Sequence, residues 1–256
     1  MQPLTAEEFE SEARKLAEAA KNNKIELRLL GALAIRIHCP KYNYLHEDLK
    51  RTYTDLDFIA YRKQKDAVLK FLTSLGYSYD FRILAVYGAN RIILTHKTTQ
   101  LKVDIFIDKL EFCHTIDFAK NRRLEVDFPT ISVSDLLVEK MQIVNITEKD
   151  IIDTCILVLE HEVGNSDDNM FNMDYITGLL SQNWGFYYTV TMNLGKVKES
   201  LLKNQKISDS EKNTGANKID TIVDAIEKAP KSSSWKLRAR VGPSKKWYNE
   251  VEDVIR

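Results

Sequence analysis

The chain has 256 residues, of which 44% are hydrophobic and 29% are charged, as in an ordinary soluble globular protein. The 37 Lys and Arg residues balance the 37 Asp and Glu residues, so binding of nucleic acid or of an anionic membrane would need a local patch. Cys39, Cys113 and Cys155 are widely spaced, which argues against a zinc site or a disulfide framework. No apolar run is long enough to span a bilayer, and the acidic N-terminal residues indicate no signal peptide, so we expect a cytoplasmic protein.

The first half of the chain alternates strand and helix patterns. Thr5 and Glu8 have the spacing of a capping box, which predicts the start of a helix. The expected elements are helix 5–22, strand 25–30, helix 31–39, a loop over 41–53, strand 54–61, helix 64–75, strands 79–87 and 91–96 joined by a turn, and strand 101–107. Strands and helices mixed in this way predict an α+β fold, in which helices flank a mixed sheet.

From about residue 130 the pattern is nearly all helical. Ser134 and Thr147 are placed to cap helices at their N-termini. The expected helices cover 134–146, 147–163, 173–202 with a break near 183–185, 218–228, and a last segment from Ser244, while 164–169 and 204–217 read as polar connections. We therefore expect an α/β domain over residues 1–129 and a mainly helical domain over 130–256.

Acidic residues alternate along one of the predicted strands. Asp55 and Asp57 share a face, about 6–7 Å apart along the chain. Asp104 lies on the polar face of strand 101–107 and would face this pair if the two strands are neighbours. Asp108 is a weaker candidate because it adjoins Lys109 at the expected end of the strand. Clustered carboxylates repel one another unless a cation lies between them, so the pattern predicts a divalent metal site; the alternative is a surface strand with outward acidic residues.

Gly31 and Ala32 lie at a strand-to-helix turn, where small residues let a phosphate approach the backbone amides. A Gly-small turn, then Asp-x-Asp, then a later Asp resembles the nucleotidyltransferase superfamily with the DNA polymerase beta-like fold, over about residues 20–110. Ala32 departs from the Gly or Ser that the family has there. The resemblance implies transfer of a nucleoside monophosphate from a nucleoside triphosphate to an acceptor hydroxyl, with Mg²⁺ or Mn²⁺ held by Asp55, Asp57 and Asp104. A catalytically inactive nucleotide- or RNA-binding module is the alternative that Ala32 favours.

Residues 134–140 and 148–153 look like two segments of the AbiEii-like branch of this superfamily, which carry a Lys and then an Asp. This similarity implies that Lys140 reaches the triphosphate and that Asp150 or Asp153 belongs to the site. The alternatives are a Lys140 that extends to water along its apolar helix face, and acidic residues that stabilise a first helical turn. The branch also allows a toxin role with an antitoxin partner, and an RNA acceptor; a small-molecule acceptor stays open.

Two further features bear on binding. Arg51 and Thr54 precede the acidic pair, where they would contact phosphate or orient Asp55; the alternative is a turn residue and a strand-entry residue. Residues 228–248 hold seven Lys and Arg residues, no acidic residue, and interleaved aromatic residues, a pattern that can bind RNA. We favour the alternative, in which these aromatic residues pack the helical domain while the charges are solvated.

Overall fold

The computed structural model describes residues 4–48 and 53–251 and divides into two compact units. The first contains Met1–Ile37, Lys50–Leu110 and Ile116–Ser132, and the second contains His38–Leu49, Glu111–Thr115 and Val133–Arg256. The main division therefore follows Ser132, where the sequence placed a boundary after Pro129.

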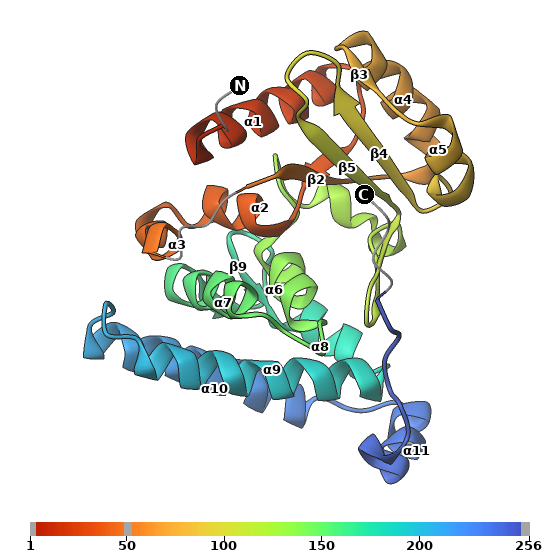
Figure 1. Ribbon diagram of the computed structural model, residues 1–256. Helices are drawn as coiled ribbons and strands as arrows, with labels where there is room; N and C mark the ends of the chain where they lie inside the picture. The colour runs from red at the N-terminus through yellow and green to blue at the C-terminus, as the bar shows by residue number, and fades with distance from the viewer. Residues whose placement is uncertain (1–3, 49–52, 252–256) are drawn as a thin grey trace. The chain divides into compact units, whose positions relative to one another are not determined.

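A five-stranded mixed sheet forms the first unit, in the order β1-β2-β5-β4-β3 (Figure 1). Its strands are β1 Leu27–Leu29, β2 Asp55–Ala60, β3 Tyr77–Ser78, β4 Arg91–His96 and β5 Lys102–Ile107. The central pair, β2 and β5, is parallel, and all other neighbours are antiparallel. This sheet, with its flanking helices, confirms the predicted α+β class.

Helices α1 Ala6–Asn22, α2 Gly31–His38, α4 Lys65–Ser74 and α5 Phe81–Tyr87 surround the sheet, with short 3₁₀ turns at Arg62–Gln64 and Lys120–Glu125. The predicted capping box starts α1: the Glu8 N–H donates to Thr5 Oγ1 at 3.2 Å, and the Thr5 N–H donates to Glu8 Oε2 at 2.7 Å. Alternate residues of β2 and β5, such as Phe58 and Ile105, are fully buried. These residues form the apolar face of the central strands; on the other face Ile59 and Phe106 are also buried, so the polar groups of that face lie toward the start of the two strands.

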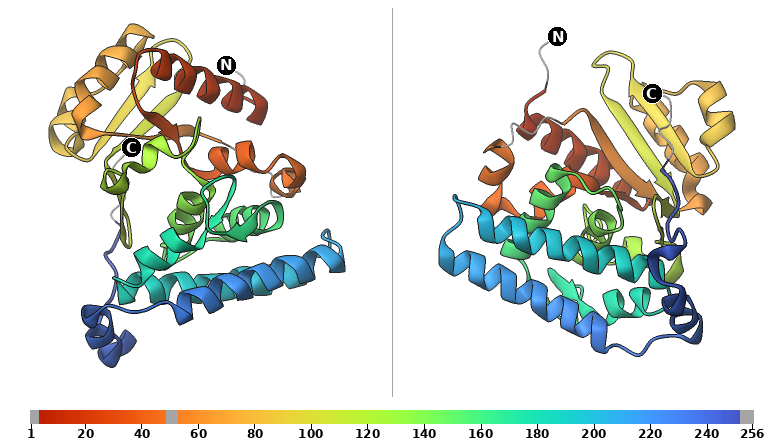
Figure 2. Two further views of the ribbon diagram at one scale, coloured as in Figure 1. Left: turned by 180° about the vertical axis from the view of Figure 1, so that it is seen from behind. Right: turned by 60° about the horizontal axis from the view of Figure 1, so that its bottom comes forward.

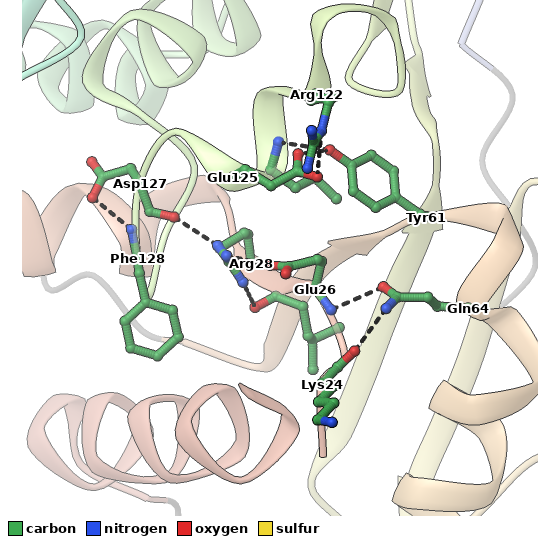
Figure 3. A network of polar contacts seen from close by, with 11 residues as sticks. Lys24, Glu26, Arg28, Tyr61, Gln64, Arg122, Glu125, Asp127 and Phe128 are labelled. Atoms are coloured by element: carbon green, nitrogen blue, oxygen red, sulfur yellow. Dashed lines mark hydrogen bonds and ion pairs between the residues drawn. The ribbon is translucent and has the colours of Figure 1, made fainter. Parts of the chain in front are cut away.

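A polar network fixes β1 relative to its neighbours (Figure 3). Arg28 donates from Nε to the Asp127 carbonyl at 2.6 Å, and Gln64 links the Glu26 N–H to the Lys24 carbonyl at 2.9 and 2.8 Å. Nearby, Tyr61 donates its hydroxyl to Glu125. These contacts hold the strand that leads into Gly31.

Two predictions for the first half are wrong. Residues 79–87 were expected as a strand, but Phe81–Tyr87 form α5, and none of the residues 81–87 is buried. Asp80 favours the helix because its Oδ1 accepts the Arg82 N–H at 2.7 Å, as an N-cap does. The expected loop over 41–53 contains, in its described part, the 3₁₀ turn Pro40–Tyr42 and helix α3 Tyr44–Asp48, both in the second unit.

The second unit is mainly helical, as predicted. Its further elements are α6 Val133–Met141, α7 Glu148–Glu160, β8 Glu162–Gly164, β9 Met170–Asn172, α8 Met173–Leu180, α9 Trp184–Lys203, α10 Asp209–Lys228, α11 Ser233–Val241 and the 3₁₀ turn Gly242–Ser244. Strands β6 Lys109–Glu111 and β7 Thr115–Asp117 form a two-stranded sheet, and the turn that joins them belongs to this unit. The long helices α9 and α10 lie side by side (Figure 2).

Some of the predicted boundaries in this half are wrong. Most of the polar segment 204–217 is helical, because Ser208 and Glu211 form a capping box that starts α10. The connection over 164–169 is flanked by the parallel pair β8 and β9. The helix expected from Ser244 is missing from residues 245–251, the last ones described; Arg238 instead donates to the Gly242 and Lys245 carbonyls at 2.6 and 2.7 Å.

Candidate functional site

The acidic residues of β2 and β5 share one face of the central sheet. Asp57 and Asp104 are direct register partners in the parallel pair, and Asp55 is paired with Lys102. Asp55 and Asp57 are half-buried, whereas Asp104 is 3% exposed. The two strands are neighbours, which was the condition set by the sequence, so Asp57 and Asp104 lie in direct register and Asp55 lies two residues from Asp57 along β2.

Arg91 is the residue that the sequence reasoning missed. It lies on β4, beside β5, and its Nε donates to Asp104 Oδ1 at 2.8 Å and to Oδ2 at 2.9 Å, while Nη2 also donates to Oδ2. The guanidinium stands over the Phe106 ring, 5.0 Å from the ring centroid. Hydrogen bonding to Asp104 raises the pKa of Arg91, as does the negative charge of Asp104, Asp57 and Asp55, while burial lowers it. Arg91 is thus a cation inside the acidic cluster.

The turn between β1 and α2 lies next to these carboxylate-bearing residues. Gly31 has φ 74°, in the left-handed region that glycine tolerates best, and α2 starts there. One residue earlier, the Leu30 N–H donates to the Asp57 carbonyl at 2.9 Å. The predicted phosphate-binding turn of Gly31 and Ala32 therefore adjoins the backbone of Asp57, and the start of a helix suits an anion.

The other predicted residues of the first unit have distinct positions. Thr54 donates its hydroxyl to Asp55 Oδ1 at 2.9 Å, which suits the predicted role in orienting Asp55. Arg51 lies outside the described residues. Asp108 lies just after β5, and its carboxylate accepts from the Arg62 N–H at 2.9 Å and from Arg62 Nε at 3.3 Å. Asp108 therefore has a partner away from the acidic pair.

The donor chemistry bears on the predicted metal. Carboxylate oxygens are the ligands that Mg²⁺ and Mn²⁺ prefer, and Asp55 and Asp57 provide them. In the part of the chain that the structure describes, no group of three or more His, Cys, Asp or Glu residues is arranged to hold a metal ion. Because Arg91 holds Asp104, Asp55 and Asp57 are the residues of this cluster that would hold such a cation.

Lys140 and Asp150 belong to a buried ion-pair network within the second unit. Lys140 Nζ lies 3.0 Å from Asp150 Oδ1 and 2.9 Å from Asp153 Oδ2, and His46 Nε2 lies 2.8 Å from Asp153 Oδ1. Burial lowers the pKa of Lys140, but the charges of Asp153, Asp150 and Glu139 outweigh this effect and raise it overall. The Lys140 side chain is only 10% exposed, so it does not extend to water as the alternative interpretation expected.

Asp150 and Asp153 differ in what they do in this network. The Asp150 N–H donates to Thr147 Oγ1 at 3.3 Å, so Asp150 also lies in the capped first turn of α7, as the alternative interpretation predicted. Asp153 is completely buried and joins Lys140 to His46, a partner that the sequence did not indicate because residue 46 is far away along the chain.

The aromatic residues of the basic segment pack against α9. The Trp235 ring meets Tyr187 edge-on at 5.0 Å, and the Trp247 ring meets Tyr188 edge-on at 5.1 Å. Arg238 stands over the Trp184 ring at 4.6 Å. Lys236 and Arg240, by contrast, are exposed. The aromatic packing agrees with the alternative interpretation, and the segment's exposed charges are fewer than the sequence alone implied.

Comparisons with known proteins add little. No family model matches the chain, and no curated protein matches it. Among solved structures, it is similar to an antigenic nucleotidyltransferase-like protein from Paracoccidioides brasiliensis, with 13% identity, a TM-score of 0.41, and coverage of 91% of this chain and 98% of that chain. A similarity at this level assigns no activity and no residue role. Over residues 4–48 and 53–251, no helix has the length and apolar character needed to cross a membrane.

Proposed function

We propose that the protein is a metal-dependent nucleotidyltransferase, which moves a nucleoside monophosphate from a nucleoside triphosphate to an acceptor hydroxyl. The observation that carries the proposal is the register pairing of Asp57 with Asp104 beside the Gly31 turn. In this reading the backbone amides at Gly31 and Ala32 bind phosphate, and Thr54 orients Asp55. Asp55 and Asp57 would hold Mg²⁺ or Mn²⁺, which would neutralise the negative charge of the phosphate oxygens.

The remaining predicted site residues keep their predicted roles as part of this proposal. Arg51 would contact phosphate from the segment that precedes Thr54. Lys140 and Asp150 are predicted to act at the triphosphate, and within their own unit they already have strong ionic partners. An effect of substituting Lys140 on activity must therefore be separated from its effect on folding.

Label transfer tests the proposal directly. Each α-labelled nucleoside triphosphate is incubated with Mg²⁺ and either cellular RNA or a pool of metabolites. We expect label to appear in one of the acceptors with the natural protein, and to disappear with Asp57→Asn. Asp66→Asn is the matched control, because Asp66 is an exposed acidic residue in the first turn of α4. Transfer that Asp57→Asn leaves intact would refute the assigned site.

A second candidate is a catalytically inactive nucleotide- or RNA-binding module. It is favoured by one specific observation, the hydrogen bonds from Arg91 that occupy the carboxylate of Asp104. Ala32, which lacks the Ser hydroxyl of the family, points the same way. This candidate predicts saturable nucleotide binding by the natural protein with no transfer of label to any acceptor.

The proposed acceptor is either RNA, which the exposed charges of the basic segment would bind, or a small molecule, and salt dependence separates the two. Lys236→Ala/Arg240→Ala should lower the slope of log affinity against log salt by roughly 0.7–0.9 per lost phosphate contact. Lys70→Ala/Lys149→Ala, which removes two exposed lysines elsewhere, is the control. No RNA binding at low salt would favour a small-molecule acceptor.

Arg238 is left out of this RNA test because it is hydrogen-bonded to backbone carbonyls, so its loss would disturb the local fold. A cytoplasmic location, and a toxin role with an antitoxin partner, belong to the same proposal. They would be tested by fractionation and by growth arrest on expression.

A further inference from the structure

The acidic cluster contains its own cation. Asp55, Asp57 and Asp104 share one face of the sheet, and Arg91 makes a two-point contact with the carboxylate of Asp104. The guanidinium and a metal ion thus compete for the same class of ligand, a carboxylate oxygen.

The Arg91 contact differs from an ordinary surface ion pair. The side chains of Arg91 and Asp104 are 17% and 5% exposed, whereas Arg62 is 53% exposed in its pair with Asp108. Phe106 covers the guanidinium from one side. Since burial excludes water and the aromatic ring restricts movement, the pair persists where an exposed pair would exchange with solvent.

We infer that Arg91 is a positioning residue that competes with a divalent cation for Asp104 and so sets the metal affinity of this site. The inference rests on the proposed metal-dependent function and extends it. With Arg91 in place, a cation is held by Asp55 and Asp57, and Asp104 contributes only when the guanidinium leaves it. Removal of the guanidinium therefore frees a third carboxylate for the cation.

Binding of Mn²⁺ alone, measured by the loss of the free-ion electron paramagnetic resonance signal, tests the inference without any need for activity. Arg91→Met should bind Mn²⁺ about tenfold more tightly than the natural protein, because the carboxylate of Asp104 becomes available as a further charged ligand. In Arg91→Met/Asp104→Asn this gain should disappear, because the freed carboxylate is absent.

Loss of a positive charge near the cluster would by itself raise cation affinity, so a control must separate the two effects. Lys102→Met is suitable, since Lys102 is exposed on the same sheet face and is the register partner of Asp55. We expect a small gain from Lys102→Met that persists when Asp104→Asn is added. A gain from Arg91→Met that also persists with Asp104→Asn would overturn the inference.

The remaining outcomes are distinct. Mn²⁺ binding by the natural protein with equal or weaker binding by Arg91→Met would overturn the competition and leave the proposed function standing. No Mn²⁺ binding by either protein, with or without a non-hydrolysable nucleotide, would overturn the proposed function itself.

If Arg91→Met does not fold, Arg91→Lys, which keeps the charge but not the two-point contact, should still bind Mn²⁺ more tightly than the natural protein. Unchanged affinity in that variant would count against the inference.

Discussion

Replacement of Lys140 by Met should destabilise the second unit strongly. Asp153 is 0% exposed and would lose the Lys140 ammonium, 2.9 Å away, while His46 stays 2.8 Å from its other carboxylate oxygen. Asp150 is 21% exposed and can be hydrated. Removal of one partner from a buried ion pair costs about 3–5 kcal/mol because the other charge stays buried. Since His46 remains and Asp150 reaches water, we expect a loss at the lower end, about 3 kcal/mol.

Lys198→Met provides the matched control. Lys198 lies 2.6 Å from Asp220, but the two side chains are 34% and 56% exposed. Exposed pairs of this kind contribute about 0–1 kcal/mol. Both substitutions replace a lysine on a helix of the same unit with the same residue, so the difference between them isolates the effect of burial.

Urea unfolding followed by tryptophan fluorescence is the appropriate measurement. The tryptophans Trp184, Trp235 and Trp247 all lie in the second unit, so the signal reports on the unit that contains Lys140. A shift of the midpoint at constant slope gives the change in the free energy of unfolding. Asp153→Asn added to Lys140→Met should restore part of the loss, because it removes the buried charge that faced the lysine.

A loss for Lys140→Met no larger than that for Lys198→Met would refute this reasoning. It would mean that the network contributes little to stability and that Lys140 is held in place for another purpose, such as a phosphate ligand. The expected large loss would instead show that the network stabilises the folded second unit. Nucleotide binding by Lys140→Met would then have to be measured on the folded fraction alone.

Three further outcomes are expected. Gly31→Ala should lower the free energy of unfolding by about 1–2 kcal/mol in a thermal melt, since φ is 74° there, and an unchanged melt would exclude the strained turn. In metal-free buffer Asp104→Asn should lower the melting temperature, because Arg91 loses its carboxylate partner. Asp57→Asn should raise the melting temperature or leave it unchanged, because it reduces repulsion between carboxylates. The reverse order would contradict the argument that these carboxylates repel one another. Burial lowers the pKa of His114 to about 4. As the pH falls from about 6.5 to about 4, the unfolded chain therefore takes up a proton before the folded protein does, and the free energy of unfolding should fall by about 3 kcal/mol. Acid titrations of stability should show no such loss for His114→Gln.

The acidic face could be predicted because the relevant signals are local. Alternation in a strand places Asp55 and Asp57 together whatever the rest of the fold does. The apolar residues on both sides of Asp104 identify a buried strand, and two buried strands in one small sheet are often neighbours. Gly31 was identifiable for a similar reason, since a glycine between a strand and a helix often marks a backbone conformation that other residues avoid.

Arg91 could not be found in this way because its role depends on register. It opens β4 and reaches Asp104 only because Ile93, two residues later, is the register partner of Asp104. No local pattern sets the offset between two antiparallel strands joined by a loop. The helix α5 escaped prediction for another reason: a short apolar run suits a strand or a helix equally well, and the Asp80 cap decided between them.

The burial of Lys140 illustrates a limit of helix-face arguments. A lysine at the edge of an apolar stripe is expected to extend toward water, and the outcome depends on what packs over it. Here α7 supplies Asp150 and Asp153, and His46 comes from a segment about a hundred residues earlier along the chain. The charge partners, rather than the helix pattern, determine where the ammonium lies.

The two candidate functions make opposite demands on Arg91. A transferase that uses Asp104 must release the guanidinium during its cycle, so the pair has to be weak enough for a cation or phosphate to break. A binding module has no such requirement, and a permanent Arg91–Asp104 pair would simply remove one repulsive charge from the apo sheet. The melting temperature of Asp104→Asn and the Mn²⁺ affinity of Arg91→Met therefore report on one quantity, the strength of this pair. A strong pair that Mn²⁺ and nucleotide together fail to break would favour the module, and a pair that they displace would favour the enzyme.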